Sequence, residues 1–103
     1  MELKYKGQNL DLKYDIGRIK IIEKATNMSL MALLSQTSGM MSLETLETYF
    51  AYGLKNVDND SYIPVLKGLE IADDLIQNEG YSQIVSIVVD ALQRDCPFFF
   101  QVA

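Results

Sequence analysis

The fold is decided in residues 12–27, LKYDIGRIKIIEKATN, where the hydrophobic period changes partway along. Before residue 15 apolar and charged residues alternate, as in a strand with one buried face, and after it isoleucines recur at helical spacing. Asp15 stands at the change, where its carboxylate can accept hydrogen bonds from the free amides at the start of a helix. The sequence therefore predicts that a strand turns into a helix at Asp15, and that the rest of the chain covers this helix.

The residues before this stretch predict a β-hairpin. Leu3 and Tyr5 alternate with charged residues, and a short turn containing Gly7 separates them from the strand that ends at Tyr14. A lone hairpin is marginally stable in water, so its apolar face must pack on the helices that follow. We expect residues 1–14 to form this hairpin.

Downstream, the apolar pattern and the capping residues predict four to five helices within residues 15–95. Asn27 suits the end of the first helix, Ser29 and Ser42 are placed to cap the second and third, and Pro64 falls in the first turn of the fourth. The fifth is expected from about Ser82 to Asp95, with an aromatic tail over residues 96–103. At 103 residues the chain forms one domain, predicted to be α+β and mainly helical, with the N-terminal hairpin packed on a compact bundle.

The helical periodicity predicts which side chains face inward. The third helix should bury Leu43, Leu46, Phe50 and Leu54. The fourth should turn inward Val65, Leu66, Leu69, Ala72, Leu75 and Ile76. Gly68 either lowers the stability of the fourth helix or marks a close helix crossing. One common core is expected to contain Tyr5, Leu12, Ile19, Ile22, Leu46, Phe50, Leu69 and Ile76.

Residues 55–61 are the most polar segment and are predicted to form a long surface loop. Their Asp-Asn-Asp spacing is similar to that of a calcium loop, but Ile63 and Leu69 stand where that motif needs glycine and glutamate. We therefore expect the acids of this loop to favour the start of the next helix and to bind no calcium.

The composition argues against an enzyme. Histidine is absent and Cys96 is the single cysteine, so there is no Ser-His or Cys-His pair, no intrachain disulfide and no multi-cysteine metal site. The acidic pair Asp73 and Asp74 stands at adjacent helical positions that diverge by about 100°, which suits a solvated surface better than a shared reacting atom. We expect no catalytic, cofactor or metal site.

The net charge is −5, with +2 in residues 1–24 and −7 in the remainder. An acidic chain without an Arg cluster is a poor candidate for nucleic acid. No apolar run reaches the roughly 18 residues that a membrane span needs, and the N-terminus has no apolar signal segment. The expected location is the cytoplasm, with no membrane partner.

The fifth helix and the aromatic tail offer more apolar surface than one face of a small domain can hide. The tail either folds back onto the core or docks on another chain. If they lie outside the core, these side chains would form a patch for a partner helix or a second copy of this chain. The predicted partner-binding residues are Val85, Val89, Phe98, Phe99 and Phe100, followed by Met40 and Met41, whose flexible side chains suit either a contact surface or the core.

A family resemblance adds a function. The hairpin, residues 12–19, residues 22–27 and the aromatic segment 49–55 before an acidic loop resemble, in pattern and order, the tail assembly chaperones of long-tailed phages and prophages. The resemblance covers roughly residues 3–80 and leaves the last helix unassigned.

The resemblance implies a non-enzymatic role in virion assembly. Proteins of this family bind the long, helical tape measure protein and keep it soluble until the tail tube protein polymerises around it, and they are absent from the mature virion. In many members a ribosomal frameshift adds an extension that recruits tube protein, and a chain of this length would be the unextended form. A helical apolar surface, five methionines and an acidic body suit the reversible binding of a helix.

Two other functions use the same features. A structural subunit of the tail or of the head-to-tail connector would bury these apolar surfaces in a closed ring. A small regulatory protein-binding module would use its acidic body to mimic nucleic acid. A ring subunit should form a symmetric oligomer by itself, whereas a chaperone should be a monomer or small oligomer that grows only with its client.

Overall fold

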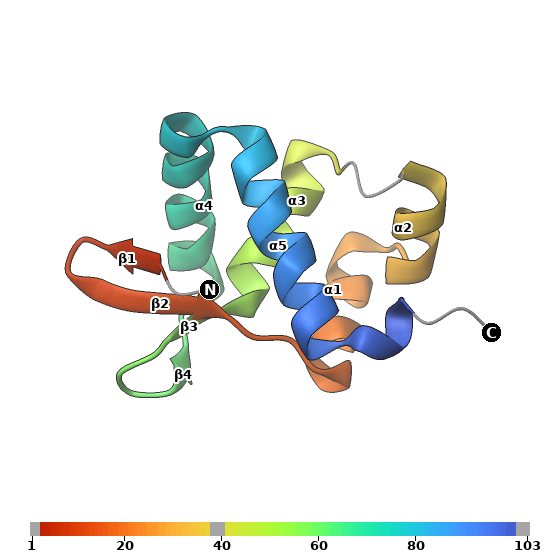
Figure 1. The fold of residues 1–103 in the computed structure, drawn as a ribbon, viewed down its shortest axis with the longest axis horizontal. Coiled ribbons are helices and arrows are strands. Elements are labelled where there is room, and N and C mark those ends of the chain that lie inside the picture. Colours follow the sequence, from red (N-terminus) through yellow and green to blue (C-terminus); the bar gives the residue numbers. More distant parts are fainter. Residues whose placement is uncertain (1–2, 38–40, 101–103) are drawn as a thin grey trace.

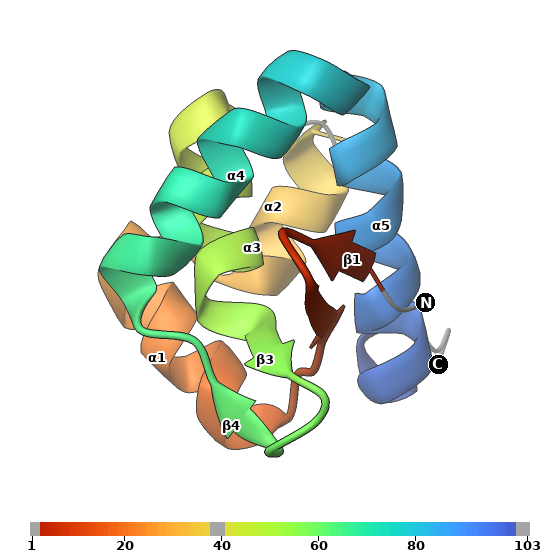
Figure 2. The ribbon, with the colours of Figure 1, turned by 90° about the vertical axis from the view of Figure 1, so that its left-hand side faces the viewer.

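The computed structural model describes residues 3–37 and 41–100 and shows an α+β fold that is mainly helical. A small sheet lies at one end of the molecule, and the helices extend from it (Figure 1). Seen from the end that carries the sheet, α4 and α5 stand on either side with α3 between them (Figure 2). The predicted fold class is therefore confirmed.

The helices begin and end close to the predicted positions. They are α1 (Ile16–Thr26), α2 (Leu30–Thr37), α3 (Leu43–Gly53), α4 (Val65–Glu79), α5 (Tyr81–Asp95) and the 3-10 turn η1 (Pro97–Phe99). The strands are β1 (Leu3–Tyr5), β2 (Gln8–Leu12), β3 (Leu54–Asn56) and β4 (Ser61–Tyr62).

The sheet is larger than the predicted hairpin. Its order is β1-β2-β3-β4, all antiparallel, so the N-terminal hairpin pairs with a second hairpin in the stretch expected to be helix end and loop. The Asn56 side-chain carbonyl accepts a hydrogen bond from the Asp58 amide at 2.9 Å, and Asp60 adopts a left-handed backbone with φ 53°. Such asparagine and aspartate turns close hairpins. Strands of three and two residues are too short to show alternation, which is why the sequence indicated only a loop.

The caps read from the sequence are present. Asp15 accepts from the Arg18 amide at 2.7 Å, Ser29 from the Ala32 amide at 3.0 Å, and Ser42 from the Thr45 amide at 3.1 Å. Asn27 ends α1 in the left-handed conformation, with φ 56°. Because each cap satisfies an amide that the helix leaves free, these residues fix where the helices begin and how they leave the sheet.

The core holds most of the residues predicted for it. Leu12, Ile19, Ile22, Leu46 and Phe50 are buried, and Tyr5 and Ile76 are partly buried against them. Leu69 was wrongly included, since it is only half-buried and lies outside the core cluster.

The predicted inward stripes of α3 and α4 need correction. Leu43 was predicted to be buried but is largely exposed, and Leu66 is 79% exposed. Gly68 meets α3 so closely that an added Cβ would lie 2.9 Å from the Cα of Ala51. This close crossing fixes the rotation of α4, so that Ile71 and Ala72 face the core and Leu66 faces away.

Tyr14 fastens the end of β2 to α3 from within the core. Its side chain is 1% exposed, and its hydroxyl donates to the carbonyl oxygen of Tyr49 at 2.7 Å. Its ring occupies the space beside Gly53, where an added Cβ would lie 2.5–2.7 Å from three atoms of the tyrosine side chain. Only glycine at the end of α3 leaves room for this ring.

Gly53→Ala should therefore destabilise the protein by about 1–3 kcal/mol, because the new methyl overlaps the Tyr14 ring. Urea denaturation followed by circular dichroism measures this. Gly17→Ala is the matched control, because its Cβ would lie 3.5 Å from the nearest atom; it should leave stability unchanged or raise it by up to about 1 kcal/mol. Equal stability of both variants would contradict the close packing of Tyr14 on Gly53.

Candidate interaction surfaces

The fifth helix and the aromatic tail lie mostly against the protein's own core. Val85 and Val89 are partly buried on it, and η1 turns the chain back so that Phe99 and Phe100 also pack there. Phe98 is 44% exposed, and its ring centroid lies 4.8 Å from that of Phe99. Of the two arrangements considered for the tail, the described part up to residue 100 thus folds back onto the core.

Of the two methionines predicted as further partner-binding residues, Met40 and Met41, the structure describes only Met41. Met41 is buried, and its backbone amide and carbonyl both hydrogen-bond to the hydroxyl of Tyr81 at the start of α5. Its side chain belongs to the core. Met40 lies outside the described residues.

Substitutions of Phe98 and Phe99 should differ in their effect on the stability of the protein. Phe99→Ser should destabilise the protein by about 1–3 kcal/mol, because its ring packs on the core, whereas Phe98→Ser should change stability by no more than about 0.5 kcal/mol. Chemical denaturation of both variants measures the difference. Equal losses would contradict the orientation of the two rings, and a folded Phe98→Ser protein with lost self-association would identify the tail as an interface.

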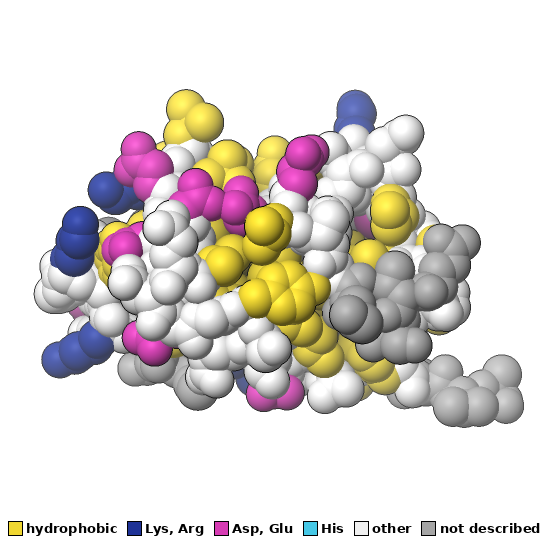
Figure 3. Space-filling view, turned by 90° about the horizontal axis from the view of Figure 1, so that it is seen from above, with side chains coloured by type: hydrophobic (Ala, Val, Ile, Leu, Met, Phe, Trp, Pro, Cys, Tyr) yellow, Lys and Arg dark blue, Asp and Glu magenta, His cyan; other side chains and the backbone are white. Residues whose placement is uncertain are grey.

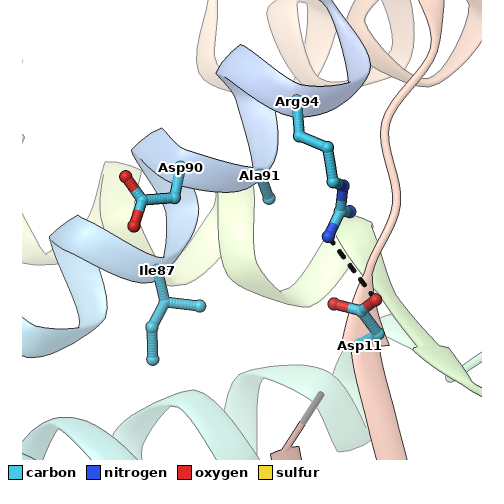
Figure 4. A pocket seen from close by; sticks show the side chains of 5 residues that line it. All are labelled: Asp11, Ile87, Asp90, Ala91 and Arg94. Carbon is cyan, nitrogen blue, oxygen red and sulfur yellow. Dashed lines mark ion pairs between the residues drawn. The ribbon is translucent and has the colours of Figure 1, made fainter. Parts of the chain in front are cut away.

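A pocket between β2 and α5 is closed at one end by an ion pair. Arg94 of α5 points toward Asp11 of β2, with 3.5 Å between its Nη1 and the carboxylate, and Ile87, Asp90 and Ala91 form the helical side (Figure 4). The pocket measures about 120 Å³, less than the roughly 300–1,000 Å³ of sites for small molecules. A second pocket, over β2 and β3, measures about 210 Å³. Neither has the size of a metabolite site.

The ion pair belongs to a structural clamp at the end of α5. Arg94 also donates to the carbonyl of Leu12 and, at 2.7 Å, to Asp95, whose carboxylate accepts the Tyr14 amide at 3.0 Å. Burial raises the pKa of Asp95, but the bonds from Arg94 and the Tyr14 amide outweigh burial and hold that pKa below its usual range. The charged groups at this pocket therefore hold α5 to the junction of β2 and α1.

Within residues 3–37 and 41–100, no group of three or more possible ligands could hold a metal ion. No helix in this part of the chain is long and apolar enough to cross a membrane.

Large apolar side chains remain exposed, mostly on helices, with Met28 in the bend after α1 and Val57 in the turn between β3 and β4. They are Ile16, Ile21, Met28, Met31, Leu43, Val57, Leu66 and Phe98. Apart from Phe98, sequence reasoning did not assign these residues to an interaction surface, because their spacing also fits the helical core. The sequence signal that could have indicated an exposed apolar residue is Ile21, because it is adjacent to the buried Ile22 and two adjacent helical residues do not face the same way.

The entire net charge of the protein lies on α3 and α4. These two helices carry six carboxylates and one lysine, which gives −5, whereas the other eight carboxylates are balanced by eight Lys and Arg residues. On the face that Figure 3 shows, hydrophobic side chains gather in the middle and acidic side chains lie around them. Apolar and acidic groups therefore share one part of the surface.

Three of these carboxylates meet where α3 and α4 cross. A hydrogen bond to Asp73 of α4 is the largest cause that raises the pKa of Glu47 to about 7, with further contributions from burial and from the charges of Asp73 and Glu44. Glu47 is therefore partly protonated at neutral pH, and its proton is shared in a hydrogen bond donated to the Asp73 carboxylate.

This pair predicts a loss of stability as pH rises. Because the folded protein binds the Glu47 proton more tightly than the unfolded chain does, the contribution of Glu47 is full below about pH 4.5 and falls as pH rises to about 7. Glu47→Gln should remove this part of the pH dependence, as measured by urea denaturation across that range. Glu70→Gln, on the outer side of α4, is the control and should keep it. An unchanged pH profile in Glu47→Gln would contradict the shared proton.

No family model, curated protein or solved structure matches this chain.

Proposed function

We propose that this protein is a non-enzymatic tail assembly chaperone of a long-tailed phage or prophage that binds the tape measure protein during tail morphogenesis. The observation that supports this proposal is the set of large apolar side chains left exposed on helices, including Ile21 and Met31 on the capped helices α1 and α2 and Leu66 on α4. A protein that holds an apolar helical client needs such side chains on a rigid surface.

The packing of the domain is consistent with this role. The caps of α1 and α3 and the buried Tyr14 hold these helices in place, so the side chains exposed on them are presented by a preformed scaffold. Binding to a preformed surface costs less conformational entropy than binding that must first order it. Such a surface can bind a client reversibly.

The test is co-expression with the tape measure protein encoded in the same tail gene cluster. The chaperone should increase the soluble fraction of that protein and co-elute with it in size-exclusion chromatography, while alone it should elute as a monomer or small oligomer. An unchanged soluble fraction would overturn the proposal. A closed symmetric ring formed by this chain alone would favour a structural tail or connector subunit instead.

A further inference from the structure

The outer sides of α1, α3 and α4 lie beside one another. On the α1 side, Ala25 and Thr26 line a small depression of about 60 Å³ together with Glu44 and Thr48 of α3. On the α4 side, α3 touches α4 through Ala51 and Gly68 and through Glu47 and Asp73. The outward row of α3 therefore runs between α1 and α4.

A stacked arginine joins α1 to α3 and to the strand that precedes α4. The guanidinium of Arg18 in α1 lies 5.6 Å from the ring centroid of Tyr52 in α3 and 3.8 Å from that of Tyr62 in β4. These stacking contacts hold the start of α1 against α3 and β4.

Apolar side chains project along both sides of α3. Ile21 and Ala25 lie one turn apart on α1, and Ile21 is 46% exposed. Leu66 and Leu69 lie in one row of α4 with Asp73, the residue that contacts Glu47 of α3. We call this surface the three-helix face and define it by Ile21, Ala25, Thr48, Leu66 and Leu69.

The charge on this face is uneven. Glu44, Glu47 and Asp73 gather on α3 and α4, and α3 has no lysine or arginine, whereas α1 carries Arg18, Lys20 and Lys24. The single lysine of α4, Lys67, lies 3.6 Å from Glu70. Carboxylates crowded in this way gain from a cation supplied by another molecule.

We propose that the three-helix face binds an amphipathic client helix whose apolar stripe lies over Ile21, Leu66 and Leu69 and whose basic flank pairs with Glu44, Glu47 and Asp73. This inference rests on the proposed chaperone function and names the chemistry of its client. The apolar rows supply affinity, and the carboxylates fix the direction of the bound helix because a reversed helix would place its basic flank away from them.

The probe is a synthetic amphipathic peptide of about 18 residues, about five helical turns, with a leucine stripe and lysines along one flank. A second peptide carries glutamate in place of every lysine. Fluorescence anisotropy should show that the lysine peptide binds the full chain at least about tenfold more tightly than the glutamate peptide. Equal affinities, or no binding of the lysine peptide, would overturn the proposal.

Matched variants locate the binding surface. Ile21→Lys and Glu44→Lys should each weaken binding of the lysine peptide at least about tenfold, because they add a positive charge to the face. Ile16→Lys changes an isoleucine that is 54% exposed on the other side of α1, and Glu79→Lys changes an acid at the end of α4; both should bind within about twofold of the original protein.

The helix positions involved are exposed, so these variants should keep the original melting curve. If Ile21→Lys unfolds, Leu66→Lys replaces it, since that side chain is 79% exposed. Equal weakening by the controls would overturn the assignment of the face. Self-association of the original protein that Ile21→Lys abolishes would also overturn it, because a second copy of this chain would then be the occupant.

The two proposals fail in different ways. If the tape measure protein is kept soluble equally well by the original protein and by Ile21→Lys, the chaperone function stands and the three-helix face is wrong. If the original protein does not keep the tape measure protein soluble, the chaperone function fails, whatever the peptides show.

Discussion

The fold depends on the fit of the Tyr14 ring against Gly53. This contact joins Tyr14, the residue before the N-cap of α1, to the last residue of α3, and the hydroxyl of Tyr14 is satisfied inside the core by the carbonyl of Tyr49. Because Gly53 leads directly into β3, the same contact sets where the second hairpin meets β2. A buried hydroxyl must find a partner, so the ring has one position and the strand-to-helix junction has one direction.

The clamp at the end of α5 completes this junction from the opposite side. Arg94 and Asp95 hold backbone groups of Leu12 and Tyr14, the residues on either side of the turn from β2 toward α1. The sheet is thereby held by its backbone and by buried tyrosine, with Arg18 of α1 stacked on Tyr62 of β4 and Asp74 of α4 accepting from Tyr5 of β1. Ile21 and Leu66 are exposed on the outer surfaces of α1 and α4.

Gly68 links the packing to the surface chemistry. Its close approach to Ala51 brings α3 and α4 together, so that Glu47 can hydrogen-bond to Asp73, and it rotates Leu66 away from the core. One small residue in the interior therefore produces both the apolar row and the carboxylate cluster of the three-helix face.

The sequence by itself determined the strand-to-helix change at Asp15, the helix caps, and most of the core, because these follow from local hydrogen bonding and from hydrophobic period. Asp15, Asn27, Ser29 and Ser42 act as predicted. Tertiary structure alone decided the second hairpin, whose strands are too short to show a pattern, and the rotation of α4, whose apolar residues spread too widely around the helix to select one face. It also decided that Phe99 and Phe100 return to the core while Leu66 stays outside, since which apolar side chain is buried depends on what lies opposite it, and that partner comes from a distant part of the chain.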